Sequence, residues 1–243
     1  MIIRLISNFF FGLAALGVGV GFLGWWVPAG DSFALIRPVF AVVCLVGFFL
    51  LRPRWLRTVV GAGALASAVA ILPVFAAQSG PGDLRLYVKN LWSGNIHYRD
   101  VAADILASDV DVVMLQELSQ RNNLILVLLA DEFPHQHVCE RSAWMGDAVL
   151  SRTAFDGVPQ CSEGRALALA PLRVDGQKVW AASVHIPWPW PYDSADNEAE
   201  AAAMLAAIDA PVVVAGDFNM KEADETDLVY LMTEAGLIDS CRS

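Results

Sequence analysis

Two short apolar runs in this sequence each end in side chains that could bind a cation or a phosphate. The run 212–215 is followed by Asp217 and Asn219, and the run 111–116 is followed by Glu117. Four to eight apolar residues bounded by turn residues are typical of buried strands. In open α/β sheets, the carboxyl ends of such strands face the crevice that holds the ligand. The pattern therefore predicts a metal and phosphate site where two acid-ended strands meet.

Asn90 and His185 also stand at the ends of apolar, strand-like runs. A carboxylate such as Glu117 is the ligand that Mg²⁺ prefers, and Asp217 could orient a nucleophile or bind a metal. Asn90 and Asn219 could donate to phosphate oxygens without adding negative charge, and His185 could neutralise a developing oxyanion. Each of these residues also has a purely structural explanation. Asn at a strand end, for example, often stabilises a turn. Their common position favours a shared site.

The surrounding elements combine hairpins with βαβ-like segments. An alternating run predicts a strand at 84–91, and two further alternating runs predict a hairpin of 165–174 with 178–186 around Asp175-Gly176. We also expect neighbouring strands at 136–140 and 147–151. Helical spacing or composition predicts helices at 98–107, from Ser119 to about 132, at 195–208 and at 227–236. We expect a sheet-rich α/β sandwich rather than a purely parallel fold.

Five segments, in this order, are similar to the successive motifs of the endonuclease/exonuclease/phosphatase superfamily. They are Lys89–Trp92, Val112–Glu117, Gly146–Arg152, Ser183–Ile186 and Gly216–Asn219. The resemblance covers residues 84 to about 240. It implies a DNase I-like, four-layer α/β sandwich that hydrolyses a phosphate ester with Mg²⁺, or with Mn²⁺ as a second candidate.

The resemblance also implies a role for each candidate residue. Glu117 would bind the metal, with Asn90 and Asp217 as further metal contacts. Asn90, His185 and Asn219 would contact the phosphate of the substrate. Asp217 would orient the attacking water, and Asn219 would stabilise the transition state of an in-line attack. His185, Asp217 and Asn219 are thus the expected catalytic residues.

The sequence departs from the family pattern in two places. Asp147 stands where the family often has Asn, which would add an acid near the site. The family also ends in an Asp-His motif, and no histidine follows Asn219 in this chain. We expect a fragment that stops before this motif, since the upstream motifs are intact. The alternative is a degenerate, non-catalytic domain that binds a phosphorylated ligand or a partner.

The first 80 residues have a different composition from the rest. The whole chain of 243 residues is 56% hydrophobic, with a mean hydropathy of +0.49. Three apolar stretches, at about 9–27, 33–51 and 58–77, are each long enough to cross a membrane. They predict a membrane domain at 1–80 with three transmembrane helices, followed by a phosphoesterase domain at 81–243.

The positions of the arginines predict the orientation. The link between the second and third stretches contains Arg52, Arg54 and Arg57, whereas the first link has no basic residue. The positive-inside rule then places the N-terminus in the cytoplasm. The phosphoesterase domain would lie on the extracytoplasmic side of the plasma or inner membrane. Arg37 could snorkel from its stretch to the surface. The alternatives are a cleaved signal peptide, or a re-entrant second stretch that leaves the domain in the cytoplasm.

The remaining residues limit the partners. Positions 81–243 contain 11 basic and 25 acidic residues, a net charge of −14, which disfavours extended nucleic-acid binding. A lipid head group, a nucleotide or nucleic acid, or a sugar phosphate stays open as substrate, and the sequence does not indicate the oligomeric state. Cys139 and Cys161 could form a disulfide or remain two unrelated thiols. The proline-rich loop with Trp188 and Trp190 could contact substrate or lipid, or it could pack as a lid.

Overall fold

A computed structural model describes residues 2–24, 26, 28–76, 84–142, 145–164, 166–188, 190, 195–219 and 236–237. The expected boundary between residues 80 and 81 lies outside these ranges, so the division into two domains stays a prediction. The expected helix at 227–236 also lies outside them, except for Gly236.

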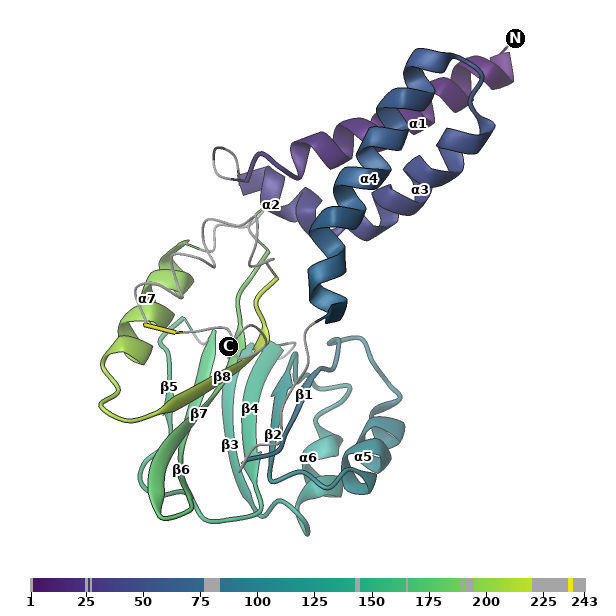
Figure 1. Cartoon of the computed structure of the whole chain (residues 1–243). Helices are drawn as coiled ribbons and strands as arrows, with labels where there is room; N and C mark the ends of the chain where they lie inside the picture. The colour runs from purple at the N-terminus through teal and green to yellow at the C-terminus, as the bar shows by residue number, and fades with distance from the viewer. Residues whose placement is uncertain are drawn as a thin grey trace.

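The N-terminal part consists of helices that pack into an elongated bundle (Figure 1). They are α1 (Ile2–Val20), α2 (Pro28–Leu35), α3 (Arg37–Leu50) and α4 (Arg54–Ala76). Apolar residues of α1, α3 and α4, among them Phe11, Cys44 and Val60, form its core. Small residues permit close contact, because a Cβ at Gly17 would lie 2.7 Å from the Phe40 ring.

The apolar stretches do not coincide with the helices. The first helix ends at Val20 rather than at residue 27, where glycines and then Pro28 disfavour helix. The second stretch is broken into α2 and α3, which are bent by 67°, because Pro38 cannot donate to a helical hydrogen bond. By length and composition, α1 is the one helix of the described residues that could cross a membrane, and the bent pair of α2 and α3 is a second candidate if the two count as one span. Three spans are not supported.

Arg37 does not snorkel to the surface. Its side chain is fully buried, Nη2 donates to the carbonyl oxygen of Gly21 at 2.6 Å, and the guanidinium lies 4.3 Å from the centre of the Phe22 ring. Burying this group is favourable only with such partners. The predicted snorkelling is therefore wrong, and Arg37 instead joins the end of α1 to the start of α3.

The C-terminal part contains two mixed, four-stranded sheets. The first has the order β1 (Leu86–Asn90), β2 (Val112–Gln116), β4 (Met145–Ser151) and β3 (His135–Ser142). The second has the order β5 (Gln160–Cys161), β6 (Leu167–Val174), β7 (Gln177–His185) and β8 (Val212–Asp217). In each sheet one pair is parallel, β1 with β2 and β7 with β8, and the other pairs are antiparallel.

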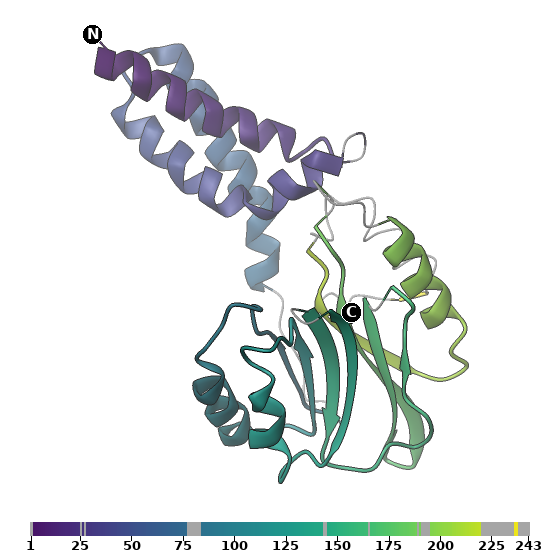
Figure 2. The same cartoon turned by 180° about the vertical axis from the view of Figure 1, so that it is seen from behind.

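Helices cover the outer faces of the two sheets, which gives four layers (Figures 1 and 2). Helices α5 (Tyr98–Ala107) and α6 (Leu124–Leu129) bury Ile105 and Ile125 against the first sheet. Helix α7 (Ala195–Ala206) buries Leu205 against the second sheet. A third core, which includes Met114 and Ala181, lies between the sheets. The predicted α/β sandwich is confirmed, although α6 is shorter than the expected helix and β5 was not predicted.

Candidate metal and phosphate site

Two parallel strand pairs, one in each sheet, deliver the predicted residues. Asn90 ends β1 and pairs with Gln116, so Glu117 follows directly on the neighbouring strand. His185 ends β7 and pairs with Asp217 at the end of β8. Both pairs end at the side of the sandwich that faces the helical bundle (Figure 1). Acids that are far apart in sequence therefore meet at one edge.

The backbone at this edge is strained. Trp92, Glu117 and Asn219 have φ values of 58°, 57° and 51°, and Asp175 in the hairpin is the remaining non-glycine residue of the described ranges with positive φ. Such left-handed conformations cost about 1–2 kcal/mol each for residues with a side chain. Strain of this kind is concentrated at functional sites, where surrounding contacts maintain it.

The Asn90 amide joins the carboxylates of the two sheets. Its Nδ2 donates to Oε1 of Glu117 at 2.9 Å and to Oδ2 of Asp217 at 2.7 Å. The second oxygen of Glu117 accepts from the backbone N–H of Ser93 at 2.8 Å. The Asn90 oxygen accepts from the N–H of Trp92 at 2.8 Å, which fixes the orientation of the amide. The two carboxylates are thus held close to one another by a neutral donor.

His185 lies beside this pair and is buried. Its Nε2 is 3.8 Å from Oε1 of Glu117, and its Nδ1 is 3.8 Å from Oδ1 of Asp147. Asp147 comes from β4, so a buried acid of the first sheet stands behind a histidine of the second. The sequence indicated Asp147 only as an extra acid, and its position near the site agrees with that expectation.

Asn219 is held at the edge of the site by its own neighbours. Its N–H donates to Oδ1 of Asp217 at 2.9 Å, and its Nδ2 donates to the carbonyl oxygen of Ile186 at 2.9 Å. The side chain therefore links the ends of β7 and β8. The sequence did not predict this bond, and the expected contact of Asn219 with a transition state stays a proposal.

The donor set fits a hard divalent cation. Ligand atoms of Glu117, His185 and Asp217 all lie within 4.8 Å of one another. Two carboxylates at this separation repel each other, and a cation between them would remove the repulsion. Carboxylate and amide oxygens are the ligands of Mg²⁺, whereas imidazole also suits transition metals.

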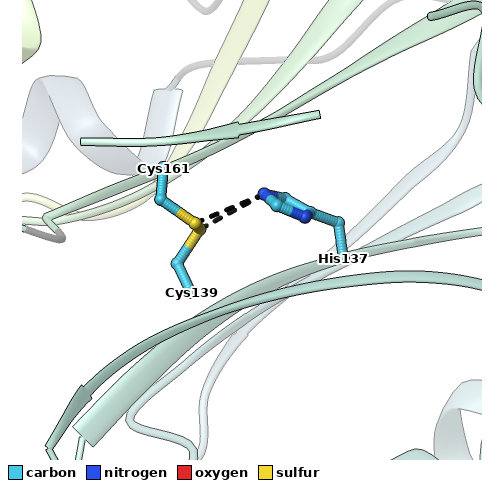
Figure 3. A group of neighbouring side chains, drawn as sticks. All are labelled: His137, Cys139 and Cys161. Carbon is cyan, nitrogen blue, oxygen red and sulfur yellow. Dashed lines mark hydrogen bonds between the residues drawn. A yellow bond between two sulfur atoms is a disulfide. The ribbon is translucent and has the colours of Figure 1, made fainter. Parts of the chain in front are cut away.

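A second group of possible metal ligands is drawn in Figure 3, and one of its members, Cys139, pairs with Asp147 across β3 and β4. His137 and Cys139 belong to β3, and Cys161 belongs to β5. The two cysteines form a disulfide, with the Nε2 atom of His137 at 3.3 and 3.5 Å from their sulfur atoms. The sulfurs are therefore not available as thiolate ligands, and the bond instead joins the edge strands of the two sheets.

Comparison with protein families agrees with this geometry. The model of the Endonuclease/Exonuclease/phosphatase family matches residues 89–227, which is more than half of the chain. The chain belongs to this family. The match includes every residue of the site described above. No curated protein matches the chain in sequence.

Several solved structures share the fold. A mutant beta toxin from Staphylococcus aureus with bound magnesium ions is 15% identical with a TM-score of 0.50, and the match covers 65% of this chain and 72% of that chain. Sphingomyelinase C from Streptomyces griseocarneus is 19% identical (TM-score 0.48; 64% and 70% covered). D. rerio TDP2 complexed with a single-strand DNA product is 18% identical (TM-score 0.49; 64% and 66%). The chain spans 65% of truncated Caenorhabditis elegans TDP2, under two thirds of its length. At these identities, the likeness concerns the fold alone.

Proposed function

We propose that this chain is a metal-dependent phosphoesterase, with Mg²⁺ as its metal and Mn²⁺ as a substitute. The observation that carries the proposal is the bridge from Asn90 to both Glu117 and Asp217, which gathers two carboxylates from two sheets beside a buried histidine. The beta-toxin structure that shares the fold contains magnesium ions, which supports the choice of metal.

The residues of the site have complementary tasks in phosphate-ester hydrolysis. Glu117 and Asp217 would hold the cation, with Asn90 keeping their oxygens in place. Asp217 would also orient the attacking water through a carboxylate oxygen. His185 would donate from Nε2 to a phosphoryl oxygen, because Asp147 lies behind the opposite nitrogen of its ring. When bound, the metal would supply positive charge for the phosphoryl oxygens.

Hydrolysis of bis-nitrophenyl phosphate by the full chain, with and without Mg²⁺, tests this proposal. Glu117→Gln should lower kcat/KM by about 100-fold or more, and calorimetry should show weaker Mg²⁺ binding. Glu132→Gln is the matched control, because Glu132 pairs with Arg152 at the opposite end of the first sheet. Equal activity of Glu117→Gln and the wild-type chain would exclude this site assignment.

We also propose that the N-terminal helices attach the chain to a membrane, with the phosphoesterase part outside. Arg52 lies in the turn between α3 and α4, and Arg54 and Arg57 lie in the first turn of α4, at the end of the bundle remote from the sandwich (Figure 1); all three are exposed. Basic residues favour the cytoplasmic side. A reporter enzyme fused to the C-terminal end should be active only outside the membrane, and cytoplasmic reporter activity would refute this orientation.

A further inference from the structure

The loop after β7 connects the candidate site to the helical bundle. It follows His185, the last residue of β7, and Asn219 of the site donates to the carbonyl oxygen of the first loop residue, Ile186. Further along the loop, the N–H of Trp190 donates to Oγ of Ser32 at 3.1 Å, and Oγ donates back to the carbonyl oxygen of Trp190 at 2.9 Å. Ser32 belongs to α2 and is buried. One short segment is thus held by the site at one end and by the bundle at the other.

Three exposed tryptophans lie where the bundle meets this loop. Trp188 and Trp190 are 40% and 54% exposed, and Trp26, in the connection between α1 and α2, is 76% exposed. The connection between α1 and α2 lies at the end of the bundle nearest the sandwich (Figures 1 and 2). Exposed indole rings are unfavourable in water and are enriched at membrane–water interfaces, where one end of the ring is apolar and the other hydrated.

The opposite end of the bundle is basic, with four exposed arginines: Arg4, Arg52, Arg54 and Arg57. The 19 residues of α1 separate the two ends by about 28 Å. This length is close to the hydrocarbon thickness of a bilayer, about 30 Å. A bundle with a basic end, an apolar surface and an aromatic end matches a bilayer in length and in the order of its groups.

We propose that the site hydrolyses a phosphate ester carried by a lipid of the membrane that holds the bundle, with Trp26, Trp188 and Trp190 in the head-group layer. The proposal rests on the proposed function. Trp188 is three residues from His185, a reach of at most about 10 Å. With the indoles at the interface, the site therefore lies next to the head groups. The net charge of the acidic part, −14 over residues 81–243, favours zwitterionic over anionic lipid.

Comparing two substrates tests the proposal. The full chain is reconstituted in phosphatidylcholine vesicles that contain a long-chain alkyl nitrophenyl phosphodiester, and it is assayed separately on soluble bis-nitrophenyl phosphate. For the W188A/W190A double variant, the ratio of vesicle to soluble activity should fall about tenfold relative to wild type, because the indoles no longer hold the site at the interface. The control Trp55→Ala removes an indole of 69% exposure at the basic end and should leave the ratio unchanged.

A binding measurement separates failure of this inference from failure of the proposed function. Vesicles of phosphatidylcholine brominated in the acyl chains should quench the fluorescence of the wild-type chain more than that of the W188F/W190F variant, whether or not the chain is active. Equal quenching of the two, or an unchanged activity ratio for W188A/W190A, would overturn the proposal. Inactivity on both substrates with the quenching difference intact would instead contradict the proposed function.

Discussion

The Nδ1 atom of His185 lies 3.8 Å from Oδ1 of Asp147, and both side chains are buried. The other ring nitrogen is 3.8 Å from Glu117. Asp147 and Glu117 belong to the first sheet, whereas His185 ends a strand of the second. The imidazole therefore stands between two acids of the facing sheet, and its orientation depends on how the sheets pack.

Asp147→Asn should lower kcat/KM by about 10- to 100-fold, as changes to groups that orient a functional histidine do. The amide keeps the shape of the carboxylate but not its charge, so the ring loses the acid that aligns it. Phosphoesterase kinetics and thermal unfolding of the variant measure the two effects separately. Asp109→Asn, at a side chain that is 85% exposed and pairs with Arg85, is the control. A loss fully explained by unfolding would argue against an orienting role.

Gly216→Ala should lower the free energy of unfolding more than Gly176→Ala, a substitution in the turn between β6 and β7. A Cβ at Gly216, where φ is 154°, would lie 2.0 Å from the carbonyl oxygen of Val184 on the paired strand. We expect a loss of at least about 3 kcal/mol in the free energy of unfolding. Gly176→Ala, at φ 82° with open space around it, should cost only about 1–2 kcal/mol. Equal losses in denaturant unfolding would show that the close approach of β7 and β8 is not the cause.

Alkaline pH should weaken the attachment of β1 to α5. Burial, followed by the hydrogen bond to Asp104, raises the pKa of Tyr87 to about 12. The unfolded chain loses this proton near pH 10, whereas the folded chain keeps it to about pH 12. The stability from Tyr87 is therefore complete below about pH 10 and is lost as the pH rises through the folded pKa. Tyr87→Phe should reduce this decline in urea unfolding, and an unchanged decline would exclude Tyr87 as its source.

Removing the disulfide should destabilise the sandwich. The bond closes a sequence separation of 22 residues between edge strands β3 and β5. A loop of this length predicts a loss of about 3 kcal/mol in the C139A/C161A variant, because the unfolded chain gains freedom. Thermal unfolding with and without a dithiol reductant measures it. The reductant should lower the Tm of the wild-type chain but not that of the variant, and a lower Tm in both would point to another cause.

The strand ends were predictable because their signal is local. Each run before Glu117 and Asp217 is apolar and stops at a polar residue, which is enough to predict a buried strand and an acid at its end. The bridge from Asn90 to both acids was not predictable in this way, because it depends on the separation of two sheets. The family resemblance indicated that Asp147 adds an acid near the site, but its distance from His185 also depends on how the two sheets pack.

For the N-terminal helices, the sequence predicted the apolar segments but not their boundaries or the position of Arg37. Hydropathy recognised the apolar stretches but not the break at Ile36, where Pro38 interrupts the backbone hydrogen bonds. Arg37 was expected at the surface because its charge is costly to bury. In the fold, the Gly21 carbonyl and the Phe22 ring compensate this cost. Average hydropathy along the sequence cannot show that Arg37 will contact the Gly21 carbonyl and the Phe22 ring.

Whether Cys139 and Cys161 are joined in the native protein depends on the redox environment in which the chain folds. A copy that reached its fold in the reducing cytosol would keep both sulfhydryls, and a membrane-impermeant alkylating reagent would add mass to them after lysis. A copy that matured beyond the membrane would resist the same reagent at these positions until it is reduced. Peptide mass spectrometry of the native protein can thus determine on which side of the membrane the domain folded, without a fused reporter.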